Sequence, residues 1–269
     1  MHERCFIQCD VFTNEAMRGN GLAVVVDGKG LSNQAMQDFD SWICQPETTF
    51  ILPANNPEAD YKVRIFTPNR ELRFAGHPTL GSCAAWLHAG GQPKVLGNVV
   101  QECGIGNVII ATGGALPGSV APPTRIEVMS TQQRDGIFAV LGIASSSLVN
   151  SAVLDNGSVW HVPELETVAA VLAVKASDVA GLPGLGIGLL GVSPTGADTQ
   201  FEIRMLSDRS AGNEDPITGS LNAAVAVWLA AQARLNSAAV IAQGSKVGRK
   251  GSIHLVPDPS VLGRILVVG

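Results

Sequence analysis

Two short segments of the chain could bind and act on an acidic small molecule. One begins at His77 and the other at Asp215, and both follow the pattern His or Asp, then Pro-x-x-Gly-Ser. A proline before an uncharged, apolar run is typical of a helix N-terminus. Free N–H groups and the positive end of the helix dipole at such a terminus bind carboxylates. The pattern predicts that His77 and Asp215 lie beside an anionic ligand. The structural alternatives are helix capping by Asp215 and a hydrogen-bonded turn histidine at His77.

Glu47 is a third candidate for chemistry. Pro46 fixes the backbone before it, and the apolar run that follows predicts a strand entering the core. A carboxyl group at that position is partly desolvated, which raises its pKa and suits it to proton transfer near neutral pH. The ordinary alternative is a surface glutamate at the end of a strand.

These residues must be positioned by two buried helices and many strands. Helices are predicted over 78–89 and 216–234; apart from Arg234 neither has a charged face, and a helix that is apolar all round is buried. Shorter amphipathic helices are predicted at 31–44, 164–172 and 175–180. Runs bounded by Gly, Pro, Asn or Asp predict strands at 5–12, 22–27, 48–52, 61–66, 107–111, 124–129, 158–162, 186–192, 200–206, 238–242, 252–256 and 264–268. The run at 186–191 also fits GxGxxG, but no helix-like segment follows it, so we interpret it as a glycine-rich strand.

The shared pattern indicates an internal duplication. His77 and Asp215 are 138 positions apart, from 77 to 215, about half of the chain, and a similar strand-like run precedes each. Chance matching of small residues is the alternative. A duplication predicts two strand-rich halves, 1–118 and 119–269, with the boundary in the proline-rich stretch 117–123 and the last strand free to return to the first half. His77 and Asp215 would then face each other across a cleft.

Composition excludes several classes of protein. The 269 residues are 46% hydrophobic and 15% charged, with a formal net charge of −5, which argues against disorder and against nucleic acid or membrane partners. The uncharged segments are interrupted by Gly, Pro, Ser or Asn, or are interpreted as the buried helix, so no membrane span is expected. The N-terminus does not resemble a signal peptide, and a cytoplasmic protein is expected. The five cysteines form no CxxC and the five histidines no HExxH, which favours free thiols and no metal site.

Further motifs occur in a characteristic order along the chain: Asp10-Val11-Phe12-Thr13, Gly19-Asn20, Ala23-Val24-Val25, Glu47-Thr48-Thr49-Phe50, Phe66-Thr67-Pro68, Glu71-Leu72, Phe74-Ala75-Gly76-His77-Pro78-Thr79, Gly212-Asn213-Glu214-Asp215-Pro216, Thr218-Gly219-Ser220, Gln243-Gly244 and Gly248-Arg249. In these the chain resembles the phenazine-biosynthesis PhzF family of isomerases. The resemblance implies an α+β, diaminopimelate epimerase-like fold with two similar domains, each a mostly antiparallel sheet or barrel around a central buried helix. It also implies a homodimer, a small carboxylate substrate and no cofactor.

The resemblance also assigns roles to residues. Glu47 resembles the family's acid/base, which moves a proton between carbons of the substrate. His77, Asp215 and Ser220 resemble residues that bind its polar groups and assist proton movement. The backbone N–H groups of Gly76, Gly212 and Asn213 lie where they could hold a carboxylate. Departures from the family pattern are Gly21, Pro46, Arg73, Asn222 and Lys250, of which Asn222 and Arg73 bear on substrate identity.

The resulting expectation is a PhzF-type isomerase acting on trans-2,3-dihydro-3-hydroxyanthranilate or a related compound. A two-base amino-acid epimerase or racemase of the same fold is an alternative, but it needs one cysteine from each half, and all five cysteines lie at or before position 103. A binding protein that keeps the fold without turnover is the other alternative.

Overall fold

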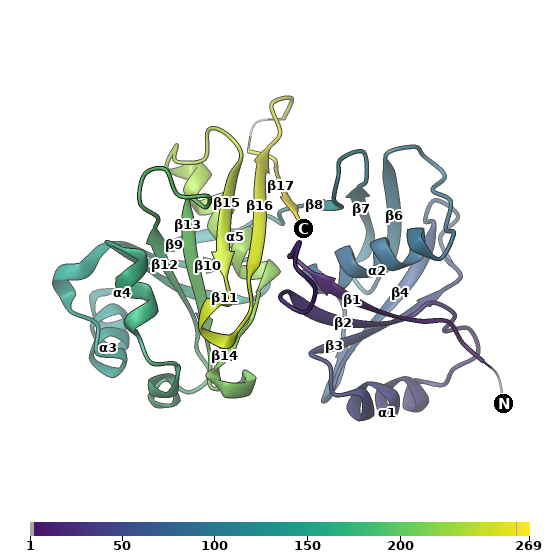
Figure 1. Ribbon diagram of the computed structural model, residues 1–269, viewed down its shortest axis with the longest axis horizontal. Helices are drawn as coiled ribbons and strands as arrows, with labels where there is room; N and C mark the ends of the chain where they lie inside the picture. The colour runs from purple at the N-terminus through teal and green to yellow at the C-terminus, as the bar shows by residue number, and fades with distance from the viewer. Residues whose placement is uncertain (1–2, 262) are drawn as a thin grey trace. The chain divides into compact units, whose positions relative to one another are not determined.

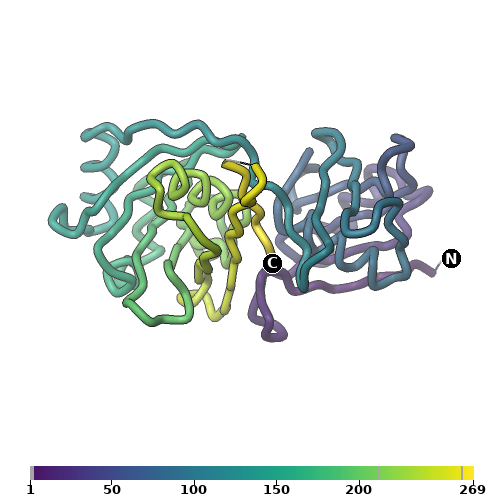
Figure 2. The backbone as a smooth tube through the Cα atoms, turned by 90° about the horizontal axis from the view of Figure 1, so that it is seen from above, coloured from purple at the N-terminus to yellow at the C-terminus, as the bar shows by residue number. Residues whose placement is uncertain are grey.

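The computed structural model describes residues 3–261 and 263–269. The chain divides into two compact units, Met1–Val120 with Val268–Gly269, and Ala121–Val267. Figure 2 traces the first unit in purple to blue, apart from its last two residues in yellow, and the second from teal to yellow. Both units are α+β, with more strand than helix. No helix among the described residues is long and apolar enough to cross a membrane.

The first unit is a single sheet with two helices. Its strands are β1 (Phe6–Val11), β2 (Asn20–Val25), β3 (Glu47–Leu52), β4 (Tyr61–Thr67), β5 (Arg70–Leu72), β6 (Asn98–Cys103), β7 (Gly106–Ala111) and β8 (Gly118–Val120). Strands β2 and β3 pair in parallel, as do β4 and β6, and the other pairs are antiparallel. The short strand β5 pairs with one end of β4, beyond the part that pairs with β6.

Two helices cover opposite faces of this sheet. Helix α1 (Asn33–Ile43) and helix α2 (Gly76–His88) lie on either side of β2 and β3 in Figure 1. On the α1 side Phe50 and Phe66 meet edge to face, with ring centroids 5.5 Å apart, in a cluster that includes Met36 of α1. On the α2 side the Ser82 hydroxyl donates to the hydroxyl of Thr49 at 2.8 Å. Since successive residues of a strand face opposite sides, Glu47 and Thr49 share the α2 face.

The second unit contains the remaining elements. Its strands are β9 (Arg125–Val128), β10 (Leu148–Asp155), β11 (Val159–Leu165), β12 (Gly186–Val192), β13 (Phe201–Leu206), β14 (Glu214–Asp215), β15 (Ala239–Gln243), β16 (Gly251–Pro257) and β17 (Ile265–Val268), whose last residue belongs to the first unit. Its α-helices are α3 (Thr131–Leu141), α4 (Val168–Ala173) and α5 (Gly219–Ala231), and its 3-10 helices are η1 (Ser145–Ser147), η2 (Ala176–Gly181), η3 (Ala211–Asn213) and η4 (Ser245–Val247).

Two glycines of β12 let helices approach its two faces. A Cβ at Gly188 would lie 2.7 Å from Leu221 of α5, and a Cβ at Gly191 would lie 2.8 Å from Val171 of α4. Positions three apart in a strand face opposite sides, so α4 and α5 cover opposite faces, as α1 and α2 do in the first unit. The run that fits GxGxxG is therefore a glycine-rich strand, as predicted.

The two units repeat one topology. In the first, β1 to β4 pair antiparallel, parallel and antiparallel; the short strand β5 and the parallel strand β6 then both pair with β4. In the second, β10 to β13 pair in the same way, with β14 and β15 on β13. Helices α2 and α5 each follow the short strand. The predicted pair of similar domains, each with one long buried helix, is thus observed.

The predicted helix starts were wrong. Helix α2 begins at Gly76, before Pro78, whereas α5 begins only at Gly219, after Pro216. Their N-cap residues are Ala75 and Thr218, and neither makes a side-chain capping bond. Asp215 is therefore not a helix cap, because the chain around it is held in strand β14 instead.

Candidate active site

Glu47 lies at the start of a buried strand. It is the first residue of β3, opposite Leu22 of the parallel strand β2, and its side chain is 18% exposed. The next residues of β3, Thr48 and Thr49, are fully buried. The strand thus carries Glu47 to the edge of the core on the face that α2 covers.

His77 is held against Glu47 by the first turn of α2. Its Nε2 lies 3.3 Å from Oε2 of Glu47, and its Nδ1 lies 3.5 Å from the side-chain nitrogen of Asn20. Asn20 starts β2 and is 1% exposed. Parallel pairing of β2 with β3 and the docking of α2 on both strands therefore bring three residues distant in the sequence together.

The imidazole of His77 is neutral near neutral pH. Burial lowers the pKa of His77 to about 3, and a hydrogen bond with the backbone of Gly21 offsets only part of that effect. The contact at 3.3 Å thus joins a neutral ring to a carboxyl group. A neutral imidazole carries one N–H and one lone pair, so it can donate a hydrogen bond to the carboxylate form of Glu47 or accept one from the carboxylic acid form. The ring itself stays uncharged in both cases.

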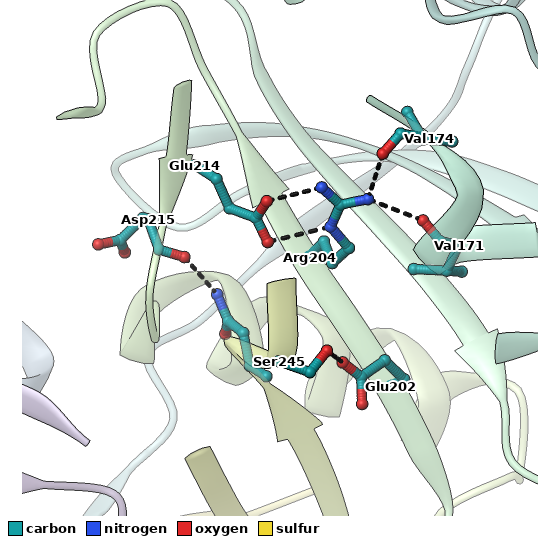
Figure 3. A network of polar contacts seen from close by, with 8 residues as sticks. Val171, Val174, Glu202, Arg204, Glu214, Asp215 and Ser245 are labelled. Carbon is teal, nitrogen blue, oxygen red and sulfur yellow. Dashed lines mark hydrogen bonds and ion pairs between the residues drawn. The ribbon is translucent and has the colours of Figure 1, made fainter. Parts of the chain in front are cut away.

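Asp215 belongs to the second unit, in the two-residue strand β14. Asp215 is opposite Met205 of β13, and the neighbouring Glu214 is opposite Leu206. The two carboxylates point to opposite sides, Glu214 toward Arg204 and Asp215 away from it (Figure 3). Because successive residues of a strand face opposite sides, Glu214 reaches its ion-pair partner Arg204 and Asp215 points to the other side of β14.

Glu214 is fixed by a buried arginine. Arg204 donates through Nε and Nη2 to the two oxygens of Glu214, at 3.0 and 2.6 Å. Its Nη1 donates to the carbonyls of Val171 and Val174, at 3.0 and 2.6 Å. Arg204 and Glu214 are 1% and 2% exposed, and Figure 3 shows the whole network. This pair anchors β14 and so places the backbone of Asp215.

The carboxyl group of Asp215 is poised between two opposing influences. Burial raises the pKa of Asp215, and the negative charge of Glu214 raises it further, while a hydrogen bond from the Thr218 hydroxyl lowers it. That hydroxyl donates to Oδ2 of Asp215. A carboxyl group of raised pKa that still accepts a hydrogen bond is suited to binding or exchanging a proton.

The other predicted residues are distributed over both units. Gly76 is the first residue of α2, and Ser220 is the second residue of α5. Gly212 and Asn213 have positive φ angles of 66° and 65° in η3. The N–H of Asn213 donates to the carbonyl of Ser210 at 2.9 Å, so it closes the turn itself. Glu47 and His77 are in contact, and Asp215 is held by a separate set of partners within the second unit.

Comparison with known proteins identifies the family. A family profile described as "Phenazine biosynthesis-like protein" (PhzC-PhzF) matches residues 9–261. The chain belongs to this family. The match spans nearly all of the chain, so it includes both units and all the motifs described above.

Individual relatives support the same assignment. "Antisense-enhancing sequence 1" of Schizosaccharomyces pombe is 33% identical, over 97% of this chain and 92% of that protein. Trans-2,3-dihydro-3-hydroxyanthranilate isomerase of Pseudomonas aeruginosa is 29% identical, over 93% of this chain and 88% of that protein. A PhzF-family phenazine biosynthesis protein of Bacillus anthracis has a crystal structure with a TM-score of 0.81 at 18% identity, covering 99% of this chain and 95% of that one. The predicted PhzF-type fold is confirmed, and the chain is an enzyme of the isomerase class.

Several polar residues around the PhzF-family motifs had no predicted role. Asn20, Thr218 and Gln243 stand within the motifs, and the structure places them against His77 or Asp215. The spacing of Asp215 and Thr218, three residues apart before a helix, could have indicated their contact. Nothing local indicates Gln243, because it reaches Thr218 through the pairing of β15 with β13.

The described residues contain no group of three or more His, Cys, Asp or Glu side chains arranged to hold a metal ion. Among the thiols, burial raises the pKa of Cys83 to about 12 and raises the pKa of Cys9 and of Cys103. Those three cysteines therefore carry a proton at neutral pH and are poor nucleophiles and bases.

Proposed function

We propose that this isomerase moves a proton between two carbons of a small carboxylic acid, with Glu47 as the acid/base. The carboxylate takes a proton from an activated carbon, and the electron pair of the broken C–H bond enters the substrate's conjugated system. The same carboxyl group returns the proton to another carbon as the double bond shifts. Atoms and electrons balance within one molecule, and no co-reactant is needed.

The observation that carries this proposal is the contact of Glu47 with the neutral ring of His77 at 3.3 Å. A general acid/base must hold and release one proton in a partly desolvated site. His77 supplies a partner that stays uncharged, since burial lowers its pKa to about 3. The ring can therefore orient the carboxyl group without fixing it as an anion.

We assign the substrate's polar groups to Asp215 and Ser220 and to the backbone N–H groups of Gly76 and Gly212. The predicted role of the Asn213 N–H is dropped, because that group donates to the carbonyl of Ser210. The raised pKa of Asp215 supports its role in assisting proton movement. The isomerases among the relatives suggest trans-2,3-dihydro-3-hydroxyanthranilate or a related cyclic carboxylic acid as the substrate. A homodimer and a cytoplasmic location stay predictions; a mass of 27.9 kDa at every concentration in light scattering would contradict the dimer.

The test is solvent deuterium incorporation by the wild type and by Glu47→Gln. In D2O the wild type should form product with deuterium at the newly protonated carbon. The folded E47Q variant should lose turnover by about 100-fold or more, because the amide cannot exchange a proton. The matched control is E58Q, an exposed glutamate of the same unit, which should keep wild-type turnover. Full activity of E47Q would overturn the acid/base assignment.

Two rivals are separated from this proposal, one by thiol modification and the other by the same deuterium assay. A racemase with one thiol from each half would be inactivated stoichiometrically by a thiol reagent and protected by substrate. All five cysteines belong to the first unit, which argues against it. A binding protein without turnover would show ligand-induced thermal stabilisation but no deuterium incorporation.

A further inference from the structure

Gln243 is a buried amide whose orientation is fixed by its surroundings. It ends β15 and is 1% exposed. Its Oε1 accepts from the backbone N–H of Thr218 at 3.0 Å and from the side-chain nitrogen of Asn222 at 2.7 Å. A backbone N–H can only donate, so the oxygen of Gln243 must face Thr218 and its NH2 group must face the other way.

The NH2 group of Gln243 then determines the direction of the Thr218 hydroxyl. Nε2 donates to Oγ1 of Thr218 at 3.1 Å and to the backbone carbonyl of Asp215 at 3.3 Å. A hydroxyl has one proton, and an NH2 group offers no acceptor for it. The proton of Thr218 is therefore directed to Oδ2 of Asp215, where the contact is observed.

We propose that Gln243 is a positioning residue that commits the hydroxyl proton of Thr218 to Asp215 and so favours the charged, hydrogen-bond-accepting form of that carboxylate. This inference rests on the proposed function in so far as Asp215 acts on the substrate. Gln243 itself touches neither the substrate nor the reacting atoms in this scheme. It reaches Asp215 through the Thr218 hydroxyl and through the backbone carbonyl of Asp215.

The first unit contains a similar glutamine–threonine pair, but its threonine hydroxyl donates to a different kind of acceptor. Gln101 is fully buried and donates through Nε2 to Oγ1 of Thr79 at 3.1 Å, while its oxygen accepts from the Tyr61 hydroxyl at 2.9 Å. The Thr79 hydroxyl donates to the carbonyl of Ala75 at 2.9 Å, in its own helix. A glutamine thus directs a threonine proton in both units, but only in the second unit is the final acceptor a carboxylate.

The charges around Asp215 explain why the direction of the Thr218 hydroxyl proton should affect the titration of Asp215. Burial raises the pKa of Asp215, and the negative charge of Glu214, the preceding residue on β14, raises it further. Glu214 is paired with Arg204 of β13, and Glu202 of β13 accepts from Ser245 at 2.9 Å. The Thr218 hydrogen bond is the opposing influence, so its loss or reversal should move the titration of Asp215 upward.

The experiment is a double-mutant cycle of Q243E and T218V, read by NMR of side-chain ¹³C-labelled aspartate in the ligand-free protein. The Asp215 signal is assigned by its absence in D215N. In Q243E one carboxylate oxygen can still accept from Thr218 N–H and Asn222, but the other accepts the Thr218 hydroxyl proton and diverts it from Asp215. Q243E should raise the Asp215 titration midpoint by about one pH unit more in the wild-type background than in the T218V background. That size is expected for a lost hydrogen bond to a charged group.

The outcomes are distinct. An equal rise with and without the Thr218 hydroxyl would mean that the added charge alone acts, and would overturn the proposal. Q200E, which adds the same charge at an exposed site next to β13, should leave the Asp215 midpoint in place. T218S, which restores a hydroxyl, should recover the wild-type midpoint that T218V loses.

A folding failure of Q243E does not prevent the test. In the unmodified chain the Thr218 hydroxyl proton should be protected from exchange, and its resonance should shift with the Asp215 titration; a freely exchanging hydroxyl would overturn the proposal. These readouts need no turnover. If D215N retained full activity, the assigned role of Asp215 would fail while the NMR result on Gln243 stood, so the two failures are distinguishable.

Discussion

The two units use the same strand order, and each ties its short strand to the preceding one with an arginine–glutamate pair of the same geometry. In the first unit Arg64 of β4 donates through Nε and Nη2 to Glu71 of β5, at 2.7 and 2.6 Å. In the second unit Arg204 of β13 donates through the same atoms to Glu214 of β14, at 3.0 and 2.6 Å. The pairs differ in burial, because Arg64 and Glu71 are 18% and 41% exposed, against 1% and 2% in the second unit.

The two ion pairs have the same hydrogen-bond geometry, but their difference in burial predicts different effects on stability when one partner is removed. A partly exposed pair is hydrated and screened, so its net contribution is small even with two good hydrogen bonds. A buried pair leaves an uncompensated charge in the core when one partner is removed. Removing one partner should therefore cost much more in the second unit, whose short strand carries Asp215, than in the first.

The largest expected effect is from Arg204→Met. Glu214 would lose its cation while still buried, and the free energy of unfolding should fall by about 3–5 kcal/mol. Denaturant titration measures the change as a shifted midpoint at an unchanged slope. Adding Glu214→Leu should recover much of the loss, because no charge then stays buried. A loss below about 1 kcal/mol for R204M would break the contrast between the units.

A glycine allows the central helix to pack closely on the sheet in each unit, but it belongs to the strand in one unit and to the helix in the other. In the second, strand residue Gly188 makes room for Leu221 of α5; in the first, helix residue Gly81 makes room for Leu22 of β2, which a Cβ would approach to 2.6 Å. Gly188→Ala should cost about 1–3 kcal/mol by overpacking. The control is Gly136→Ala at an exposed position of α3, where a Cβ meets nothing within 4 Å, and where about 1 kcal/mol should be gained. Equal thermal midpoints of the two variants would refute this.

Much of the fold could be predicted from local pattern. Strand β12 has the predicted bounds, and most other predicted strands differ from the observed ones by one or two residues at an end. Strand β10 was missed because Asn150 and Ser151 interrupt its apolar run, and helix α3 was missed because Gly136 lowers its helix propensity. These elements depend on tertiary pairing and on the capping of α3 by Ser130 more than on their own composition.

The shared motif predicted equivalent positions for His77 and Asp215, and the structure gives them different ones. His77 is in the first turn of α2, while Asp215 is in strand β14, four residues before α5. Pairing of β14 with β13 holds Asp215 extended and delays the helix. The partner Arg204 could not be predicted from the motif, because the contact requires the fold of β13 against β14. Similar short patterns do not fix conformation where long-range pairing competes.

The neutral ring of His77 predicts that the free energy of unfolding falls as the pH falls below the unfolded pKa of histidine. The folded pKa of about 3 lies below the unfolded value of 6.5, so the contribution to stability is complete above pH 6.5 and is lost as the pH falls toward 3. Between pH 6 and pH 5 the loss should be about 1 kcal/mol.

His77→Gln should flatten this slope of unfolding free energy against pH, whereas His88→Gln, at an exposed position, should keep it. The measurement is denaturant unfolding at each pH. The buried His161 of the second unit, whose pKa is also lowered by burial, leaves a residual slope in the H77Q variant. An unchanged slope in H77Q would show that His77 is not the neutral buried histidine described here.

The smallest expected effect is from Arg64→Met, the counterpart of R204M. Arg64 also donates to Asn33 of α1 at 2.6 Å and lies over the ring of Phe66, 5.0 Å from its centroid. Methionine keeps the apolar stem against Phe66, and water reaches Glu71, so the loss should be about 1 kcal/mol or less. Added salt should weaken the contribution of the Arg64–Glu71 pair and leave that of Arg204–Glu214 nearly unchanged. A loss for R64M as large as that for R204M would mean that hydrogen-bond geometry, and not burial, sets the stability of both short strands.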